Sequence, residues 1–433
     1  MTTDSPGTTS QDFGHREATW AGTHVFGASR IHNPHTVEEA QRLVADTPRI
    51  RALGTRHSFN DVADSRGELV SLVGVEPDIV IDESPQGTTV SVSGGTTYGV
   101  LAAELERRGL ALHNMGSLPH ISVAGAISTA THGSGNRNGN LATAVRALEV
   151  IGADGELSSV KAGDPDFAGS VVALGLLGVT ARVTLAVEPS FHVRQDIYAD
   201  LPWDTVLDSF DEVSGCGYSV SLFTNWLGDS VQRMWLKTRL DGGQPGDLPD
   251  ELFGGRREVV SQRSPAGEFL DNTTRQGGIP GPWSERLPHF RFDATPSNGD
   301  EIQTEYLIAR ADAAEALEAL RPLGPLIEPA LLITELRTVA ADSLWLSTAY
   351  QRDSLCIHFT WKNLPEEVAA TIPLVEAALE RFAPRPHWGK VFTLDGSLAR
   401  SRYDRLDEFA GLVARCDPAG KFGNDYSSLV LGS

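Results

Sequence analysis

The chain has 433 residues, and at roughly 150 residues per domain this length indicates two or three domains. Lysine and arginine number 36 against 57 aspartate and glutamate residues, which gives a formal charge of −21 at pH 7. Such a charge repels phosphate backbones and anionic lipids, so we expect no nucleic-acid partner and no membrane partner. We expect a small neutral partner instead. The 43 glycines exceed the usual share of about 7%, which indicates many tight turns or close backbone approaches to a ligand.

The cysteines and the N-terminus favour a cytoplasmic protein. Cys216, Cys356 and Cys416 are widely spaced and form no Cys-x-x-Cys pair, so they predict neither a disulfide framework nor a zinc knuckle. Residues 1–18 lack the basic and apolar regions of a secretory signal and are expected to be disordered. The longest weakly polar stretch, residues 167–181, is too short to span a bilayer. We therefore expect reduced thiols in a cytoplasmic monomer.

The first 190 residues predict alternating helices and strands. Thr36 and Glu39 form a capping-box pattern at the start of the first helix. Ala153-Asp154-Gly155 is a hairpin signal between two strands. The predicted helices cover residues 36–45 and 97–108. The predicted strands cover residues 50–54, 69–73, 79–82, 88–93, 145–151 and 156–160.

Beyond residue 190 the pattern changes to longer strands that carry aromatic residues. The predicted strands cover residues 218–226, 234–237, 330–339 and 354–361. The predicted helices cover residues 311–320 and 364–382. Residues 241–291 have weak periodicity and predict no element. The whole pattern is typical of the α+β class with mostly antiparallel sheet.

The common nucleotide-binding motifs fail. A Gly-x-Gly-x-x-Gly motif that starts at Gly133 would need its third glycine one residue before Gly139, and no P-loop sequence occurs. Two other segments, residues 52–58 and 115–135, are rich in glycine and small hydroxyl residues. Their weakly shielded backbone N–H groups are suited to hold a pyrophosphate. Two tight loops that need positive φ angles are the alternative explanation.

Two predicted strands each present polar residues at a spacing of two. Ile333, Glu335 and Arg337 share one face of the first strand, and His358 and Thr360 share one face of the second. Carboxylate and guanidinium groups supply complementary acceptors and donors for a ligand with hydroxyl groups. A cross-strand ion pair on a solvated sheet face is the alternative.

A metal site formed by His113, His120 and His132 is not expected. Their spacings match no i, i+4 pair on a helix, and no acidic partner lies close by.

Four segments together resemble the vanillyl-alcohol-oxidase-type flavoprotein superfamily, and within it most closely the sugar-alcohol oxidases, followed by the aldonolactone oxidases. They are Gly54-Thr-Arg-His-Ser58, residues 116–135, His387-Trp-Gly-Lys390 and Asp417-Pro-Ala-Gly-Lys-Phe422. The resemblance extends from Trp20 to the C-terminus and implies a two-domain flavoprotein. It implies an FAD-binding domain over residues 19–190, an antiparallel-sheet substrate domain over 191–390, and a C-terminal segment, 391–433, that completes the FAD-binding domain.

The resemblance implies that FAD is attached covalently through His57. A neutral imidazole nitrogen is a competent nucleophile toward the benzylic methyl position of a flavin. A histidine that only forms hydrogen bonds within its loop is the alternative. The other cofactor-binding residues that the resemblance implies are Ala52, Leu53, Gly54, Thr55, Arg56, Ser58, Ser117, Ser122, Gly125, Thr129, Ala130, Thr131, His132, Val179 and His387.

The implied reaction oxidises a primary hydroxyl of a polyol such as xylitol or sorbitol to an aldehyde, while dioxygen becomes hydrogen peroxide. A base with a near-neutral pKa is needed; His358 is the candidate, and Lys390 is expected to support the developing alkoxide. Gly116 leaves room for dioxygen because it has no side chain. The expected substrate-binding residues are Ser117, Gln303, Glu335, Arg337 and Thr360.

Two other functions compete with this interpretation. One is an aldonolactone oxidase or dehydrogenase of the same superfamily. The other is a flavin-free carbohydrate-binding protein that keeps the fold.

Overall fold

The structure is a computed structural model that describes residues 17–242, 246–259, 262–265, 271–294, 300–393 and 395–431. Most of the segment expected to be disordered, residues 1–16, lies outside the described residues. Ala18 pairs with Val25 in an isolated bridge, so ordered pairing begins there. None of the helices in these ranges is both long and apolar enough to cross a membrane. The three cysteines are unpaired, as expected.

The N-terminal part contains two main sheets. The strand orders are β1-β3-β2, with parallel pairing, and β4-β5-β9-β7-β8, with antiparallel pairing. A short antiparallel pair joins β6 to β10. The bounds are β1 Arg30–His32, β2 Ile50–Ala52, β3 Glu68–Val70, β4 Val80–Ser84, β5 Gly87–Ser93, β6 Leu110–Ala111, β7 Val145–Ile151, β8 Leu157–Lys161, β9 Val179–Ala186 and β10 Glu188–Pro189. The predicted hairpin of β7 and β8 is confirmed.

The predicted strand over residues 69–73 is too long. β3 ends at Val70, and the chain turns through a 3-10 helix over Leu72–Gly74. The side chain of Ser71 accepts a hydrogen bond from the backbone N–H of Val73, which stabilises the turn in place of the strand.

The predicted N-terminal helices are confirmed. α1 covers Val37–Asp46, and the Thr36 side chain accepts a hydrogen bond from the Glu39 backbone N–H, as the capping pattern requires. α2 covers Tyr98–Arg107, and the chain then turns through Gly109 at a φ of +71°. Two short helices were not predicted: α3 Val123–Ser128, inside the glycine-rich segment, and α4 Phe167–Val171.

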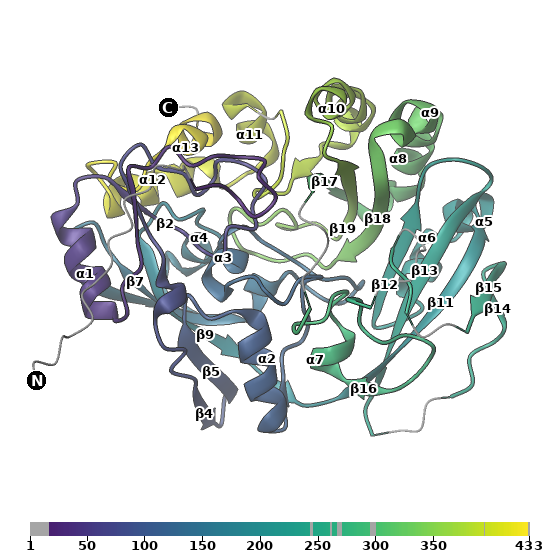
Figure 1. Ribbon diagram of the computed structural model, residues 1–433, viewed down its shortest axis with the longest axis horizontal. Coiled ribbons are helices and arrows are strands. Elements are labelled where there is room, and N and C mark those ends of the chain that lie inside the picture. The colour runs from purple at the N-terminus through teal and green to yellow at the C-terminus, as the bar shows by residue number, and fades with distance from the viewer. Residues whose placement is uncertain are drawn as a thin grey trace, which may run out of the picture.

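The C-terminal segment packs on the N-terminal part, as Figure 1 shows from the neighbouring yellow and purple ribbons. It contains α11 Gly396–Arg402, α12 Leu406–Cys416 and α13 Asp425–Leu431. The Asn424 side chain donates to the carbonyl oxygens of Asp61 and Asp64, and Lys421 donates to that of Val44. Phe409 joins the hydrophobic core that contains α2. These contacts attach the C-terminal segment to the N-terminal part of the chain.

One ten-stranded sheet forms most of the second part. Its order is β14-β15-β11-β13-β12-β18-β19-β17-β20, and β16 pairs with β11 beside this path. The bounds are β11 His192–Pro202, β12 Ser219–Thr224, β13 Ser230–Leu240, β14 Glu251–Leu252, β15 Gly255–Glu258, β16 Gly281–Pro282, β17 Glu301–Ala309, β18 Leu331–Val339, β19 Ser354–Lys362 and β20 Arg385–Pro386. All of its pairings are antiparallel, as expected for this half of the chain.

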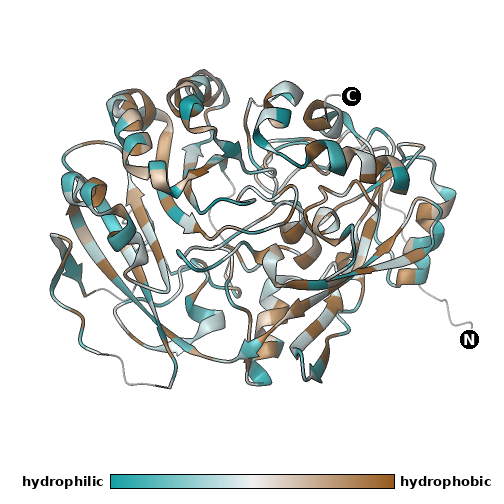
Figure 2. Cartoon of the chain, turned by 180° about the vertical axis from the view of Figure 1, so that it is seen from behind, coloured by the Kyte–Doolittle hydropathy of each residue, from teal (hydrophilic) through white to brown (hydrophobic). Residues whose placement is uncertain are grey.

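Helices cover the apolar face of this sheet (Figure 1). They are α5 Trp203–Asp208, α6 Phe210–Gly215, α8 Ala313–Leu320, α9 Gly324–Ile327 and α10 Pro365–Leu379, and a further helix, α7 Trp283–Arg286, packs beside β16. Leu336, Ile357 and Phe359 belong to the core beneath the helices. Apolar and polar residues alternate along the strands in Figure 2. The neighbours Glu335, Arg337, His358 and Thr360 therefore lie on the opposite face.

Candidate active site

A cavity of about 620 Å³ lies where the polar face of the large sheet meets the N-terminal part. All but one of the predicted site residues line it. These residues are Ala52, Leu53, Gly54, Thr55, Arg56, His57, Ser58, Ser117, Ser122, Gly125, Thr129, Thr131, His132, Val179, Gln303, Glu335, Arg337, His358, Thr360, His387 and Lys390. Gly116, the glycine expected to leave room for dioxygen, also lines it.

Ala130 is the exception. It is fully buried and absent from the cavity wall, so the prediction that it contacts a cofactor is not supported. Its φ of +54° reverses the backbone between Thr129 and Thr131, which do line the cavity. A contiguous motif therefore alternates here between the core and the cavity.

The loop over residues 54–58 fits a diphosphate. Among the residues that the structure describes, none accepts a hydrogen bond from the backbone N–H groups of these five positions. Arg56 adopts a left-handed conformation with a φ of +65°, which helps successive N–H groups converge in an anion-binding nest. Gly54 and Gly125 approach each other across Ser122, and a Cβ on either would lie under 3 Å from the Ser122 Oγ. The two glycines therefore leave room for the Ser122 hydroxyl in its present position, and a side chain at either position would displace it.

His57 lies at the edge of this loop as a neutral imidazole. Burial, reinforced by nearby His120, lowers its pKa to about 4. Its ring stacks on Trp20 with a centroid distance of 5.5 Å, and its Nδ1 lies 3.0 Å from the Thr55 hydroxyl oxygen. An imidazole that is unprotonated at pH 7 keeps the lone pair that a nucleophile needs.

Three adjacent strands bring the polar residues of the large sheet into register. His358 on β19 lies opposite Glu335 on β18 and opposite Glu305 on β17. One step along the sheet, Thr360 lies opposite Gln303. The predicted shared faces of β18 and β19 are confirmed, because their polar residues all line the cavity.

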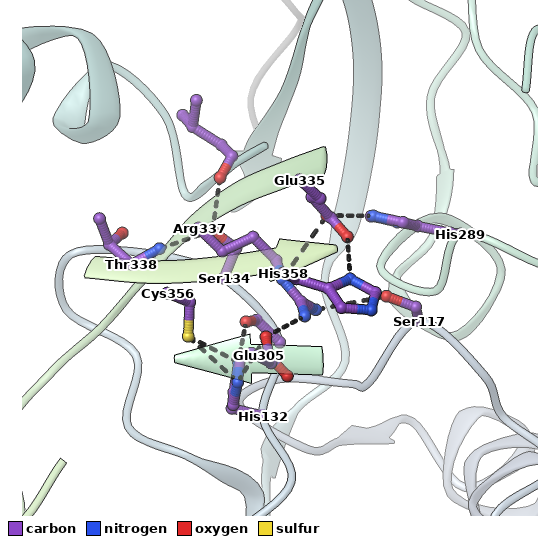
Figure 3. A network of polar contacts seen from close by, with 12 residues as sticks. Ser117, His132, Ser134, His289, Glu305, Glu335, Arg337, Thr338, Cys356 and His358 are labelled. Atoms are coloured by element: carbon purple, nitrogen blue, oxygen red, sulfur yellow. Dashed lines mark hydrogen bonds and ion pairs between the residues drawn. The ribbon is translucent and has the colours of Figure 1, made fainter. Parts of the chain in front are cut away.

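Glu305 is the centre of a buried charge network that the sequence analysis missed (Figure 3). Its carboxylate lies 2.6 Å from Lys390 Nζ, 2.8 Å from an Arg337 nitrogen and 3.3 Å from His132 Nε2. Burial disfavours its charge, but Lys390, His132 and Arg337 together hold its pKa well below the ordinary value. Lys390 shows the opposite balance, because burial lowers its pKa although Glu305 opposes the shift.

Glu335 is held in a similar way. His289 Nε2 lies 2.7 Å and Arg337 Nε lies 3.6 Å from its Oε1 atom. Burial opposes its charge, yet Arg337 and His289 hold its pKa well below the ordinary value. Arg337 thus bridges two buried carboxylates, and its NH1 atom lies 3.4 Å from the Ser117 hydroxyl at the cavity wall.

His358 has the free lone pair that a base requires. Neither ring nitrogen forms a hydrogen bond within the described residues, and Nδ1 lies 3.7 Å from Glu335 Oε2. Burial and the positive charge of Lys390 lower its pKa to about 4. This value is lower than the near-neutral pKa expected from the sequence, because both effects act against a second positive charge in the same cavity.

His132 has an acidic neighbour, contrary to the expectation from the sequence. Glu305 lies beside it in space, and atoms of His132, Glu305 and Cys356 all lie within 4.8 Å of one another. The Cys356 Sγ atom is 3.2 Å from His132 Nε2. Lys390 and Arg337 already neutralise the Glu305 carboxylate, so the cluster is an internal hydrogen-bond network next to two cations.

Comparisons with known proteins agree with this geometry. Residues 28–161 match an FAD binding domain, and residues 298–430 match the D-arabinono-1,4-lactone oxidase family. An alditol oxidase from Streptomyces sp. is 43% identical over 410 residues, which cover 94% of this chain and 97% of that protein. An L-gulono-1,4-lactone dehydrogenase from Mycobacterium tuberculosis is 31% identical over 433 residues, which cover 95% and 98%. A cholesterol oxidase from B. sterolicum shares the fold, with a TM-score of 0.75 at 14% identity over 99% of this chain and 100% of that one.

The fold and the FAD-binding domain define an FAD-dependent oxidoreductase that uses oxygen. The chain belongs to the family of alditol and aldonolactone oxidoreductases within the vanillyl-alcohol-oxidase-type flavoproteins.

Proposed function

We propose that this protein oxidises a primary hydroxyl of a polyol such as xylitol or sorbitol. The alcohol R–CH2OH loses two electrons and two protons to give R–CHO, and O2 gains them to give H2O2. The observation that carries the proposal is the set of Glu305, His358 and Glu335 in register beside Arg337, with an imidazole on the cavity wall that has no hydrogen-bond partner among the described residues. Alternating acceptors and donors of this kind suit a chain of hydroxyl groups.

The cavity residues have separate catalytic and binding roles in this proposal. The loop over residues 54–58 and the residues around it would hold FAD, which would supply the two-electron acceptor for the alcohol and the route of these electrons to dioxygen. His358 accepts the hydroxyl proton on its unpartnered nitrogen. Lys390 and Arg337 place positive charge where the alkoxide develops. Ser117, Gln303, Glu335 and Thr360 bind the remaining hydroxyls.

An aldonolactone substrate is the second candidate, and the match of residues 298–430 to the arabinonolactone oxidase family supports it. A peroxide-release assay with xylitol, sorbitol, glycerol and a gulono- or galactonolactone separates the two. We expect release with xylitol or sorbitol. Activity on the lactones alone would overturn the polyol proposal.

A covalent bond between His57 and the flavin is part of the proposal. We expect His57→Ala to lose the yellow colour that otherwise stays with the polypeptide after acid precipitation. The reason is that only an unprotonated imidazole in this loop offers a nucleophilic nitrogen to the cofactor. His120→Ala is the control, since His120 is a nearby histidine that bonds to the Phe292 carbonyl oxygen. Colour that remains in the His57 variant after precipitation would contradict the bond.

Gly116 is proposed to keep a path open for dioxygen. An alanine Cβ would lie 3.6 Å from Ile121 Cδ1 and 3.7 Å from Thr131 Cγ2, which are ordinary contacts, so Gly116→Ala should fold normally. We expect the reduced enzyme to react with dioxygen about tenfold more slowly, while reduction by xylitol keeps its rate. Stopped-flow measurement of the two half-reactions tests this. Gly74→Ala, on the exposed 3-10 turn, is the control, and an equal oxygen rate in both variants would contradict the role of Gly116.

We also propose that the protein is a cytoplasmic monomer that binds neither nucleic acid nor membrane. The unpaired, exposed Cys216 and Cys416 support a reducing compartment. The charge of −21 disfavours polyanionic partners. Light scattering after size exclusion tests the monomer, and a dimer mass would contradict it.

A further inference from the structure

Lys237 lies buried behind the cavity, and the proposed reaction gives it no role. It is in β13, only 1% exposed, and its ammonium donates to the carbonyl oxygen of Leu287 and lies 3.2 Å from His289 Nδ1. Burial lowers its pKa to about 7, so its place in the core has an energetic cost. Within the part of the chain that the structure describes, Lys237 has no carboxylate in hydrogen-bond contact, which is unusual for a buried lysine.

His289 lies between a donor and an acceptor. Lys237 Nζ faces its Nδ1 atom, and the Glu335 carboxylate lies 2.7 Å from its Nε2 atom. A carboxylate only accepts, and the Lys237 amine has N–H groups to donate to Nδ1 whether or not it is protonated. Burial also lowers the pKa of His289 to about 4, so the ring is neutral. Its one proton must therefore lie on Nε2 and point to Glu335.

The His289 ring is fixed in place by its surroundings. It packs edge-on against Trp235 with a centroid distance of 4.9 Å and near Phe223 at 6.1 Å. Its backbone N–H donates to the Ser117 carbonyl oxygen at 3.1 Å. Two strands and one cavity loop therefore hold the imidazole in the orientation that its hydrogen bonds require.

The chain of contacts ends at His358. Once His289 donates to Glu335 Oε1, the Oε2 atom faces His358 Nδ1 at 3.7 Å, as Figure 3 shows. A carboxylate oxygen on that side favours a proton on Nδ1 and leaves the lone pair on Nε2. Arg337 also contacts Glu335, at 3.6 Å, so His289 shares the orienting role.

We propose that Lys237 and His289 are positioning residues that orient Glu335 and thereby fix the tautomer of His358. This chain of hydrogen bonds and contacts leads from Lys237 through His289 and Glu335 to His358. It rests on the proposed function, because it gives the proposed base its free Nε2 lone pair.

Nitrogen NMR of the oxidised, FAD-loaded protein labelled with 15N-histidine tests the proposed tautomers of His289 and His358 directly. Long-range proton–nitrogen correlations distinguish protonated from unprotonated ring nitrogens, and loss of signals in His289→Leu and His358→Asn assigns the two rings. We expect a proton on Nε2 of His289 and on Nδ1 of His358. A His289 proton on Nδ1 would overturn the proposal. So would a ratio of the two His358 tautomers that is unchanged in His289→Leu, because Arg337 alone would then orient Glu335.

Kinetics provide the second measurement. Because Arg337 still holds Glu335, we expect His289→Leu to lower kcat with xylitol by about tenfold. His289→Gln should stay within about threefold of the wild type, because the amide retains an N–H donor for Glu335. The kcat of Lys237→Met should lie between those of the leucine and glutamine variants of His289. Equal kcat values for the leucine and glutamine variants, at unchanged melting temperatures, would overturn the positioning role.

His113→Leu is the matched control, because His113 is a part-buried histidine outside the wall of the large cavity. We expect its kcat to match the wild type. A tenfold loss there would mean that the effect at His289 is general destabilisation and would overturn the proposal. Wild-type protein that oxidises no polyol would contradict the proposed function instead. The NMR measurement would still show whether His289 and His358 have the proposed tautomers.

Discussion

His358→Ala should slow flavin reduction by saturating xylitol about 100- to 10,000-fold and should change the KM by less than about threefold. The reason is that a primary alcohol must lose its hydroxyl proton as the carbon gives up hydride. His358 is the cavity imidazole on the sheet whose two nitrogens lack a partner among the described residues. Anaerobic stopped-flow spectroscopy of the flavin absorbance measures the rate.

The control for this prediction is Thr360→Val. Thr360 lies two residues along the same strand and also lines the cavity. Loss of its hydroxyl removes a binding contact and no base, so the KM should rise while the rate at saturation stays nearly constant. Near-normal flavin reduction in His358→Ala would contradict the role of His358 as the base.

The pH dependence of kcat/KM provides a second test of His358 as the base. A base works unprotonated, and burial together with Lys390 lowers the pKa of His358 to about 4. Wild-type kcat/KM should therefore stay level as the pH falls from 7 to 5. With an ordinary histidine of pKa about 6.5 as the base, kcat/KM would fall about 25-fold over the same range. A decline that begins near pH 6.5 would contradict the environment described for His358.

The polar face of β18 and β19 could be predicted because strand periodicity alone sets it. A spacing of two puts Glu335 with Arg337 and His358 with Thr360 on one side, whatever the neighbouring strands are. The cofactor loop could also be predicted from the sequence, since glycines and small hydroxyl residues cluster in residues 52–58. The motif did not reveal that Ala130 faces the core, because the positive φ angle that turns this residue inward is not visible in the sequence.

Glu305 and His289 could not be predicted in the same way. Glu305 lies two residues after Gln303 on β17, a spacing that resembles the other polar pairs, but its strand was not predicted. Its partner Lys390 is 85 positions away, so only the fold brings the two charges together. His289 belongs to residues 241–291, where the periodicity is weak. Lys237 is a lysine in a strand, and a lysine ordinarily indicates a solvated position.

Glu305→Leu should cost about 3–5 kcal/mol of the free energy of unfolding, because it leaves the buried Lys390 without its counter-charge. Lys390 would lose its carboxylate partner at 2.6 Å, while Arg337 would keep Glu335. Burial already lowers the pKa of Lys390, and loss of Glu305 would lower it further. A neutral lysine no longer stabilises an alkoxide, so turnover should fall as well.

A second substitution separates stability from chemistry. Replacing an entire buried ion pair with apolar residues is often nearly neutral, so Glu305→Leu combined with Lys390→Met should recover part of the stability. It should not recover turnover, because the positive charge at the cavity is gone. Denaturant unfolding and xylitol kinetics measure the two effects, with the exposed Glu318→Leu on α8 as control. A loss below about 1 kcal/mol in Glu305→Leu, similar to that of a surface substitution, would contradict the role of Glu305 as the shared counter-charge.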